Sequence, residues 1–160
     1  MILVECYLDE FLIKLLIKEM GFSSRLIKHE GGRGNVLNKL KNLNQGGVAV
    51  VDEDPHSAWP RDMKNYVKKE EKDGIKLFVR VDDSKKRLIQ LSPYLEHWLL
   101  ERAKNNNISP KDFSLPQSAK ELHSIPHIER KSDFQRFVKE IVERDSVIKT
   151  FKKWLKNESK

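Results

Sequence analysis

The first residues of the chain place a short apolar run before a segment of helical periodicity. Residues 2–4 are all apolar, and from residue 8 onward apolar side chains recur three and four positions apart: Leu8, Phe11, Leu12, Leu15, Leu16 and Met20. This spacing predicts a buried strand at 2–4, followed by an amphipathic helix. We expect the helix to end at Gly21, because glycine readily adopts the backbone conformation of a helix C-terminus.

The same alternation continues to residue 51. Residues 24–30 are predicted to form a second strand, and the glycine-rich segment 31–34 a tight loop. Asn35 is placed to cap a second helix. Residues 48–51 are all apolar, as expected of a strand that is covered on both faces. Strands and helices that alternate with short connections predict a Rossmann-like α/β fold with a mainly parallel sheet flanked by helices.

The middle of the chain is less regular. We predict a third helix at 61–71 and a fourth strand at 75–82. Residues 87–91 form either a fifth strand or the approach to the next helix. Ser92 is predicted to cap that helix, with Pro93 at its first position, where the missing N–H costs nothing.

The C-terminal part is predicted to be helical after a long loop. Residues 105–126 are rich in Asn and Pro, which indicates loop with a helical turn after Pro110. Ser132 is expected to cap a helix with an apolar face. Apolar residues at 147–155 either continue this helix or form a separate one that is capped near Asp145.

We predict a single domain, residues 1–160, with an α/β core at 1–83 and a basic helical extension at 84–160 packed on it. Lys and Arg outnumber Asp and Glu by 31 to 24, and the excess lies in the extension. This asymmetry favours an anionic partner such as DNA or RNA, because Lys and Arg neutralise phosphates. Solvated lysine-rich helices would produce the same pattern.

The lone cysteine, Cys6, excludes an intramolecular disulfide and a zinc site built from several cysteines. The apolar N-terminal segment is too short for a membrane span, because charged side chains interrupt it at helical spacings: Glu5, Asp9, Glu10, Lys14 and Lys18. We therefore expect an intracellular, cytoplasmic protein that does not contact a membrane.

Acidic residues stand where two predicted strands end. Glu5 follows the first strand, and Asp52, Glu53 and Asp54 follow the third. Because ligands bind at the C-terminal edge of a parallel sheet, we expect Glu5 and Asp52 to lie close together. In extended backbone Asp52 and Asp54 project to the same side, and Pro55 favours an extended Asp54.

Converging carboxylates repel one another unless one is protonated or a cation balances them. A hard cation such as Mg²⁺ or Mn²⁺ suits oxygen ligands and leaves coordination positions for a phosphate oxygen. Such an ion neutralises phosphate charge and lowers the pKa of an attacking water, while Glu5 could serve as a general acid or base. A solvated strand end is the alternative explanation for any single one of these acids.

Three segments together resemble the Toprim domain of topoisomerases, bacterial-type primases and overcoming-lysogenization-defect nucleases. They are LVECYLDEFLIKLL, HEGGRGNVLNKL and VAVVDEDP, and the resemblance covers roughly residues 1–83. It implies that Glu5 corresponds to the catalytic glutamate and Asp52 and Asp54 to the metal-binding pair. Cys6 stands where the family usually has glycine.

Further residues complete the predicted site. Glu96, in a helix that resembles one of stand-alone Toprim-like proteins, is a candidate fourth carboxylate, or else a solvent-facing glutamate. Gly32 and Arg33 in the glycine-rich loop, together with Lys28 and Arg61, are candidates for contacts with phosphate. A plain turn at Gly32 is the simpler interpretation.

The sequence therefore supports two functions of different classes. The first is metal-dependent cleavage or processing of nucleic-acid phosphodiesters with Mg²⁺ or Mn²⁺ as the cofactor. The alternative is a catalytically inactive Toprim-like module that binds nucleic acid or a protein partner, as part of a defence or toxin assembly.

Overall fold

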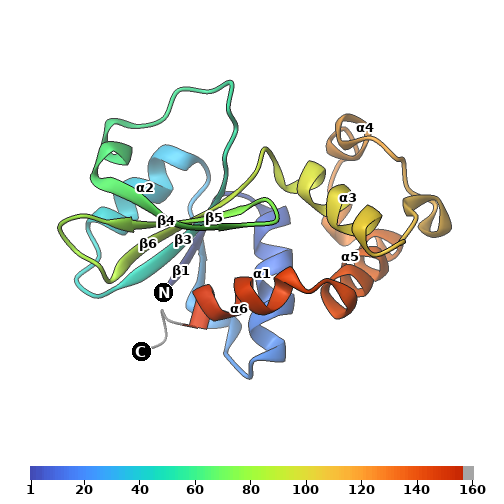
Figure 1. Cartoon of the computed structure of the whole chain (residues 1–160), viewed down its shortest axis with the longest axis horizontal. Helices are drawn as coiled ribbons and strands as arrows, with labels where there is room; N and C mark the ends of the chain where they lie inside the picture. The colour runs from blue at the N-terminus through green and yellow to red at the C-terminus, as the bar shows by residue number, and fades with distance from the viewer. Residues whose placement is uncertain (157–160) are drawn as a thin grey trace.

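A computed structural model describes residues 1–156, which form a six-stranded sheet with helices on both faces (Figure 1). The strand order is β2-β1-β3-β6-β5-β4, in which β2, β1, β3 and β6 run parallel and β5 and β4 are antiparallel. The predicted α/β class with a mainly parallel sheet is confirmed. The strands are β1 Ile2–Val4, β2 Ile27–His29, β3 Gly47–Asp52, β4 Tyr66–Lys72, β5 Ile75–Arg80 and β6 Lys86–Leu91.

Helix α2 lies on one face of the sheet, and α1 and α6 lie on the other (Figure 1). The helices α3, α4 and α5 form a lobe beside the sheet. The α-helices are α1 Tyr7–Glu19, α2 Arg33–Lys41, α3 Leu95–Asn105, α4 Ala119–His123, α5 Ser132–Arg144 and α6 Val147–Lys156. Short 3-10 helices are η1 Ser24–Leu26, η2 Arg61–Asn65, η3 Pro110–Phe113 and η4 Ile128–Arg130.

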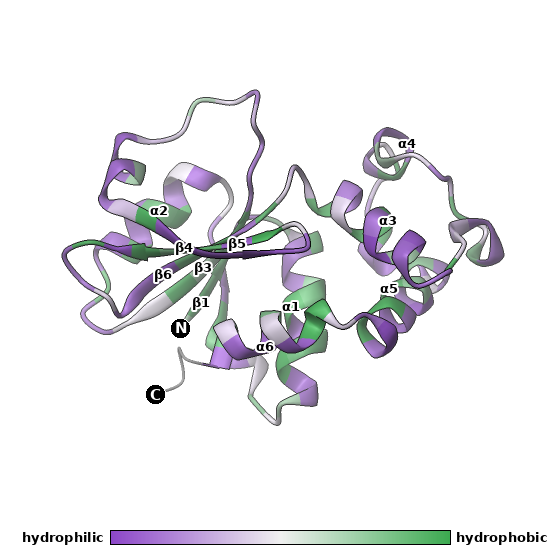
Figure 2. Cartoon of the chain, viewed as in Figure 1, coloured by the Kyte–Doolittle hydropathy of each residue, from purple (hydrophilic) through white to green (hydrophobic). Residues whose placement is uncertain are grey.

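The sheet separates two hydrophobic clusters. Alternate residues of β3 enter each one: Val48 and Val50 face the larger cluster, and Ala49 and Val51 face the smaller. The larger cluster includes apolar residues of α1, α3, α5 and α6, while the smaller joins the sheet to α2. Figure 2 shows the green, hydrophobic stripe of α1 turned toward this interior. Burial on both faces explains why β3 is a continuous apolar run.

The predicted helix at 61–71 is wrong. Only η2 is helical there, and the chain continues as β4, which pairs with β5 through a hairpin. The turn residues Asp73 and Gly74 have φ angles of 47° and 86°, as a tight hairpin turn requires. Beyond Tyr66, the residues of β4 are exposed, so this edge strand has no apolar alternation to reveal it.

Several predicted boundaries also change. Strand β6 lies between β3 and β5, so the α/β core extends past residue 83 to Leu91. Helix α2 is capped at Gly32 rather than Asn35, and Tyr94 rather than Ser92 precedes α3. Ser132 is the first residue of α5 and not its cap.

The C-terminal predictions largely hold. The turn after Pro110 is η3, and α6 is a separate helix after Asp145. The short helix α4 within the predicted loop was not anticipated. None of the helices in residues 1–156 is long and apolar enough to cross a membrane.

Candidate functional site

The four parallel strands end at one edge of the sheet, and acidic residues gather there. Val4 is in register with Val50, and Asp52 with Leu91, so the ends of β1, β3 and β6 are neighbours. The backbone N–H of Asp52 is close enough to the carboxylate of Glu5 to act against the rise of its pKa. The predicted proximity of Glu5 and Asp52 is therefore observed in the structure.

Asp52 stands at the centre of this group. Its Oδ1 accepts a hydrogen bond of 3.0 Å from the backbone N–H of Leu95, which is the first residue of α3. Asp52 thus caps the start of α3 from another element, which explains why Ser92 is not needed as the cap. Burial raises the pKa of Asp52 to about 8, with further contributions from the charges of Asp9, Glu96 and Glu5.

Asp9 is a site residue that the sequence analysis did not select. It lies in the first turn of α1, only 1% exposed, and its Oδ2 accepts bonds from the backbone N–H and the thiol of Cys6 at 3.3 and 3.2 Å. Burial raises the pKa of Asp9 to about 7, and the charges of Glu5 and Glu96 add to the rise. Its Oδ1 is buried and finds no hydrogen-bond partner among residues 1–156. The spacing of four residues from Glu5 could have pointed to Asp9.

The turn between Glu5 and α1 does not need glycine. Cys6 precedes the helix with φ −139° and ψ 172°, which is extended backbone that any residue adopts. Burial raises the pKa of Glu5, and the charge of Asp54 adds to the rise. Arg33 and the N–H of Asp52 lower this pKa, but by less. Glu5 is therefore poised to hold a proton more readily than an exposed glutamate.

Asp54 is near Glu5, but the reasoning that placed it is wrong. Its φ is 46°, so Asp54 is not extended and does not simply project beside Asp52. Its backbone N–H donates to the carbonyl of Pro93 at 2.9 Å, and its Oδ2 accepts from Ser57 Oγ at 2.7 Å. These contacts outweigh the preference for extended backbone before Pro55.

Glu53 faces away from the acidic group. It forms an ion pair with Lys76 on β5. Burial opposes its ionisation, but the ion pair with Lys76 outweighs burial, and the pKa of Glu53 is lowered. Of the three consecutive acids, Glu53 is thus the one whose negative charge is stabilised by a lysine.

Glu96 lies inside the group rather than in solvent. It is in the first turn of α3, 9% exposed, and its charge acts on both Asp52 and Asp9. Glu96 Oε1 lies 3.1 Å from Nδ1 of His123 on α4, whose side chain is largely exposed. His123 was not predicted, because only the folded lobe brings α4 beside α3.

Arg33 holds the loop that carries the acids. Its guanidinium donates to the carbonyls of Glu53 and Ala58 at 3.2 and 2.9 Å, and it stacks over Trp59 at 4.0 Å. Trp59 Nε1 donates to the same Glu53 carbonyl at 3.0 Å. Arg33 therefore fixes the segment after β3, and its predicted contact with phosphate stays a prediction.

Of the other predicted phosphate ligands, some lie near the acidic edge and one does not. Gly32 lies at the acidic edge, where its N–H approaches the carbonyl of Glu5 at 3.4 Å and its φ of 114° suits glycine. Lys28 is exposed on edge strand β2, in register with Leu3. Arg61 is next to Asp62, which pairs with Arg80 at the opposite edge of the sheet, so the fold does not bring Arg61 to the acids.

The carboxylate oxygens of this group suit a hard divalent cation, but in this structure the side chains do not converge on one point. The group is built from carboxylates, and in the described part of the chain the buried Oδ1 of Asp9 lacks a hydrogen-bond partner. Within residues 1–156, no group of three or more His, Cys, Asp or Glu side chains is arranged to hold a metal ion. One oxygen each of Asp52 and Asp9 instead accepts protein hydrogen bonds. Metal binding would require these side chains to rotate.

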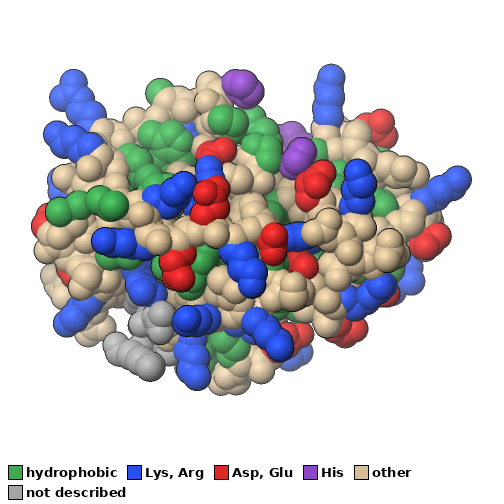
Figure 3. Space-filling model, in the orientation of Figure 1, with side chains coloured by type: hydrophobic (Ala, Val, Ile, Leu, Met, Phe, Trp, Pro, Cys, Tyr) green, Lys and Arg blue, Asp and Glu red, His purple; other side chains and the backbone are tan. Residues whose placement is uncertain are grey.

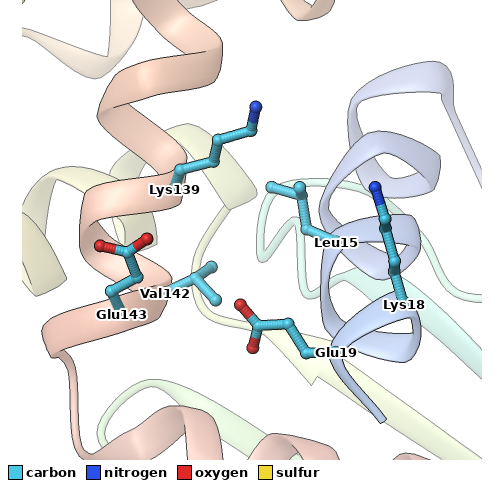
Figure 4. Close-up of a pocket in the computed structure, with 6 residues that line it drawn as sticks. All are labelled: Leu15, Lys18, Glu19, Lys139, Val142 and Glu143. Carbon is cyan, nitrogen blue, oxygen red and sulfur yellow. The ribbon is translucent and has the colours of Figure 1, made fainter. Parts of the chain in front are cut away.

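The acidic edge is distinct from a surface hollow between α1 and α5 (Figure 4). That hollow, of about 150 Å³, lies at the C-terminal end of α1, whereas Asp9 lies at the N-terminal end. Its lining is formed by Leu15, Lys18, Glu19, Lys139, Val142 and Glu143. On the face shown in Figure 3, Lys and Arg side chains are interspersed with Asp and Glu.

Comparison with known proteins found no match: no family model, no curated protein and no solved structure is similar to the chain.

Proposed function

We propose that the protein cleaves or processes nucleic-acid phosphodiesters with the help of Mg²⁺ or Mn²⁺, as the Toprim resemblance implies. One observation carries the proposal: Asp52 is surrounded by Asp9, Glu96 and Glu5, which come from three other segments and meet at the C-terminal edge of the sheet. Folding four acids together is costly unless some of them are protonated or a cation balances their charge, and a bound cation would let all four ionise. An ordinary solvated strand end would not include the buried Asp9.

Asp52, Asp9 and Glu96 would hold the ion, with Asp54 at the rim. When bound, the ion would supply positive charge for the phosphate oxygens and lower the pKa of a water. Glu5 accepts a proton from the attacking group, a role that suits a carboxylate whose pKa burial raises. Arg33 keeps the segment after β3 in position through two carbonyl contacts. The loop amide of Gly32 and the side chain of Lys28 remain the proposed phosphate contacts, in a cytoplasmic protein.

The test is cleavage of labelled DNA and RNA by purified protein with Mn²⁺. Wild type is expected to cleave at least one of the two, and Asp52→Asn is expected to abolish cleavage. The control is Glu101→Gln, which removes an exposed carboxylate elsewhere on α3. Equal cleavage by wild type and the Asp52 variant would trace the activity to a contaminant. Binding that persists in EDTA and weakens with salt, without cleavage, would favour the inactive nucleic-acid-binding module instead.

A further inference from the structure

An exposed pair of stacked rings stands beside the acidic group. Tyr7 on α1 and His29 on β2 have ring centroids 4.3 Å apart and an interplanar angle of 6°. Tyr7 is 58% exposed, and His29 is also exposed. Among the large hydrophobic side chains exposed in residues 1–156, Tyr7 is the aromatic one.

The backbone ties both rings to the segment that carries Glu5. Tyr7 follows Glu5 by two residues, so their Cα atoms are at most about 8 Å apart. His29 is in register with Val4, and the next N–H, that of Glu30, donates to the Val4 carbonyl at 3.0 Å. The stacked pair is thus a fixed part of the edge at which the acids lie.

A ligand with a flat aromatic face can stack on the exposed ring of Tyr7. One face of the Tyr7 ring lies against His29, and more than half of the surface of Tyr7 is exposed to solvent. Every nucleobase has a π face that stacks on such a ring, and the contact tolerates any base sequence. A base paired in a duplex has both faces covered already, so an unpaired base is the better ligand.

We propose that Tyr7 and His29 form a stacking platform for an unpaired nucleobase next to the phosphodiester that the acids process. The inference rests on the proposed function and narrows its substrate to single-stranded or locally unpaired nucleic acid. Tyr7 supplies the surface, and His29 fixes the orientation of its ring. Base stacking adds affinity without reading sequence.

The test compares two fluorescent probes in EDTA, by fluorescence anisotropy: a short oligothymidylate and an abasic sugar-phosphate oligomer of equal length. Wild type is expected to bind the oligothymidylate between about 5-fold and about 100-fold more tightly. Tyr7→Ala should remove this preference, and Tyr7→Phe should keep it because the ring remains. His29→Ala should reduce it.

The matched control is Val81→Ala, which trims an exposed apolar side chain after β5, at the opposite edge of the sheet. This variant should keep the full preference. Equal binding of the two probes by wild type, no binding of either, or an unchanged preference in Tyr7→Ala would overturn the platform. EDTA removes metal, so this binding assay does not depend on metal-dependent cleavage. If wild type prefers the base-containing probe but shows no Mn²⁺-dependent cleavage, the proposed function is refuted and the platform stands.

Discussion

Replacing Asp52 by Asn should make the stability of the protein less sensitive to pH. Burial raises the pKa of Asp52 from 3.8 to about 8 and that of Asp9 from 3.8 to about 7. At pH values above 3.8 and below these raised pKa values, the folded protein holds protons that the unfolded chain has released. The free energy of unfolding contributed by these groups is therefore fully present below about pH 4 and falls as the pH rises toward 8.

The magnitude follows from the number of protons held. Each proton bound only by the folded state makes the free energy of unfolding fall by about 1.4 kcal/mol per pH unit. Counting one proton for the coupled pair Asp52 and Asp9, wild type should lose about 3 kcal/mol between pH values of about 5 and 7. Asn keeps the acceptor for the N–H of Leu95 and cannot titrate, so Asp52→Asn should lose less stability than wild type, with the remaining loss coming from the buried Asp9.

The assay is urea unfolding at both pH values, followed by the fluorescence of the buried Trp98 and Trp154. Glu101→Gln removes an exposed carboxylate and should reproduce the behaviour of wild type. If Asp52→Asn loses as much stability as wild type between the two pH values, the carboxyl group of Asp52 does not hold a proton in the folded state. The argument from charge repulsion would then fail.

Three further substitutions test individual contacts of the fold, of which the first holds the loop at the site. Arg33→Ala removes bonds to two loop carbonyls and should lower the free energy of unfolding by about 1 to 3 kcal/mol, with no rescue by Arg33→Lys. Trp154→Phe removes the bond of 3.0 Å to Glu70, and a loss of about 1 to 3 kcal/mol in urea unfolding is expected. Gly74→Ala should cost more than about 1 kcal/mol, because φ is 86° and a Cβ would lie 2.6 Å from Trp98 Cδ1; an unchanged melting temperature would contradict this.

The sequence predicted those elements whose apolar periodicity along the chain matches the positions that the fold buries. β1, α1 and β3 bury regular apolar positions, so their periodicity is visible in the chain. β4 could not be recognised in this way, because an edge strand of Lys and Glu carries no apolar face. The Asp73–Gly74 turn was the available signal for the hairpin.

The candidate site was predicted in part for the same reason. Glu5 and Asp52 meet because parallel strands end at one edge, which topology alone dictates. Asp9 and His123 depend on how α1 and α4 pack, and periodicity does not report that packing. Asp54 was misjudged because contacts with distant residues override the local preference of a residue before proline.

The central claim is that these acids share a divalent cation, and a crystal soaked in MnCl₂ tests it most directly. The account predicts anomalous density between Asp52, Asp9 and Glu96, with Glu5 nearby, and predicts that the density disappears in Asp52→Asn. Asp52 and Asp9 should have rotated to coordinate the ion. A soaked crystal without manganese among these carboxylates, or with manganese bound only elsewhere, would contradict the account.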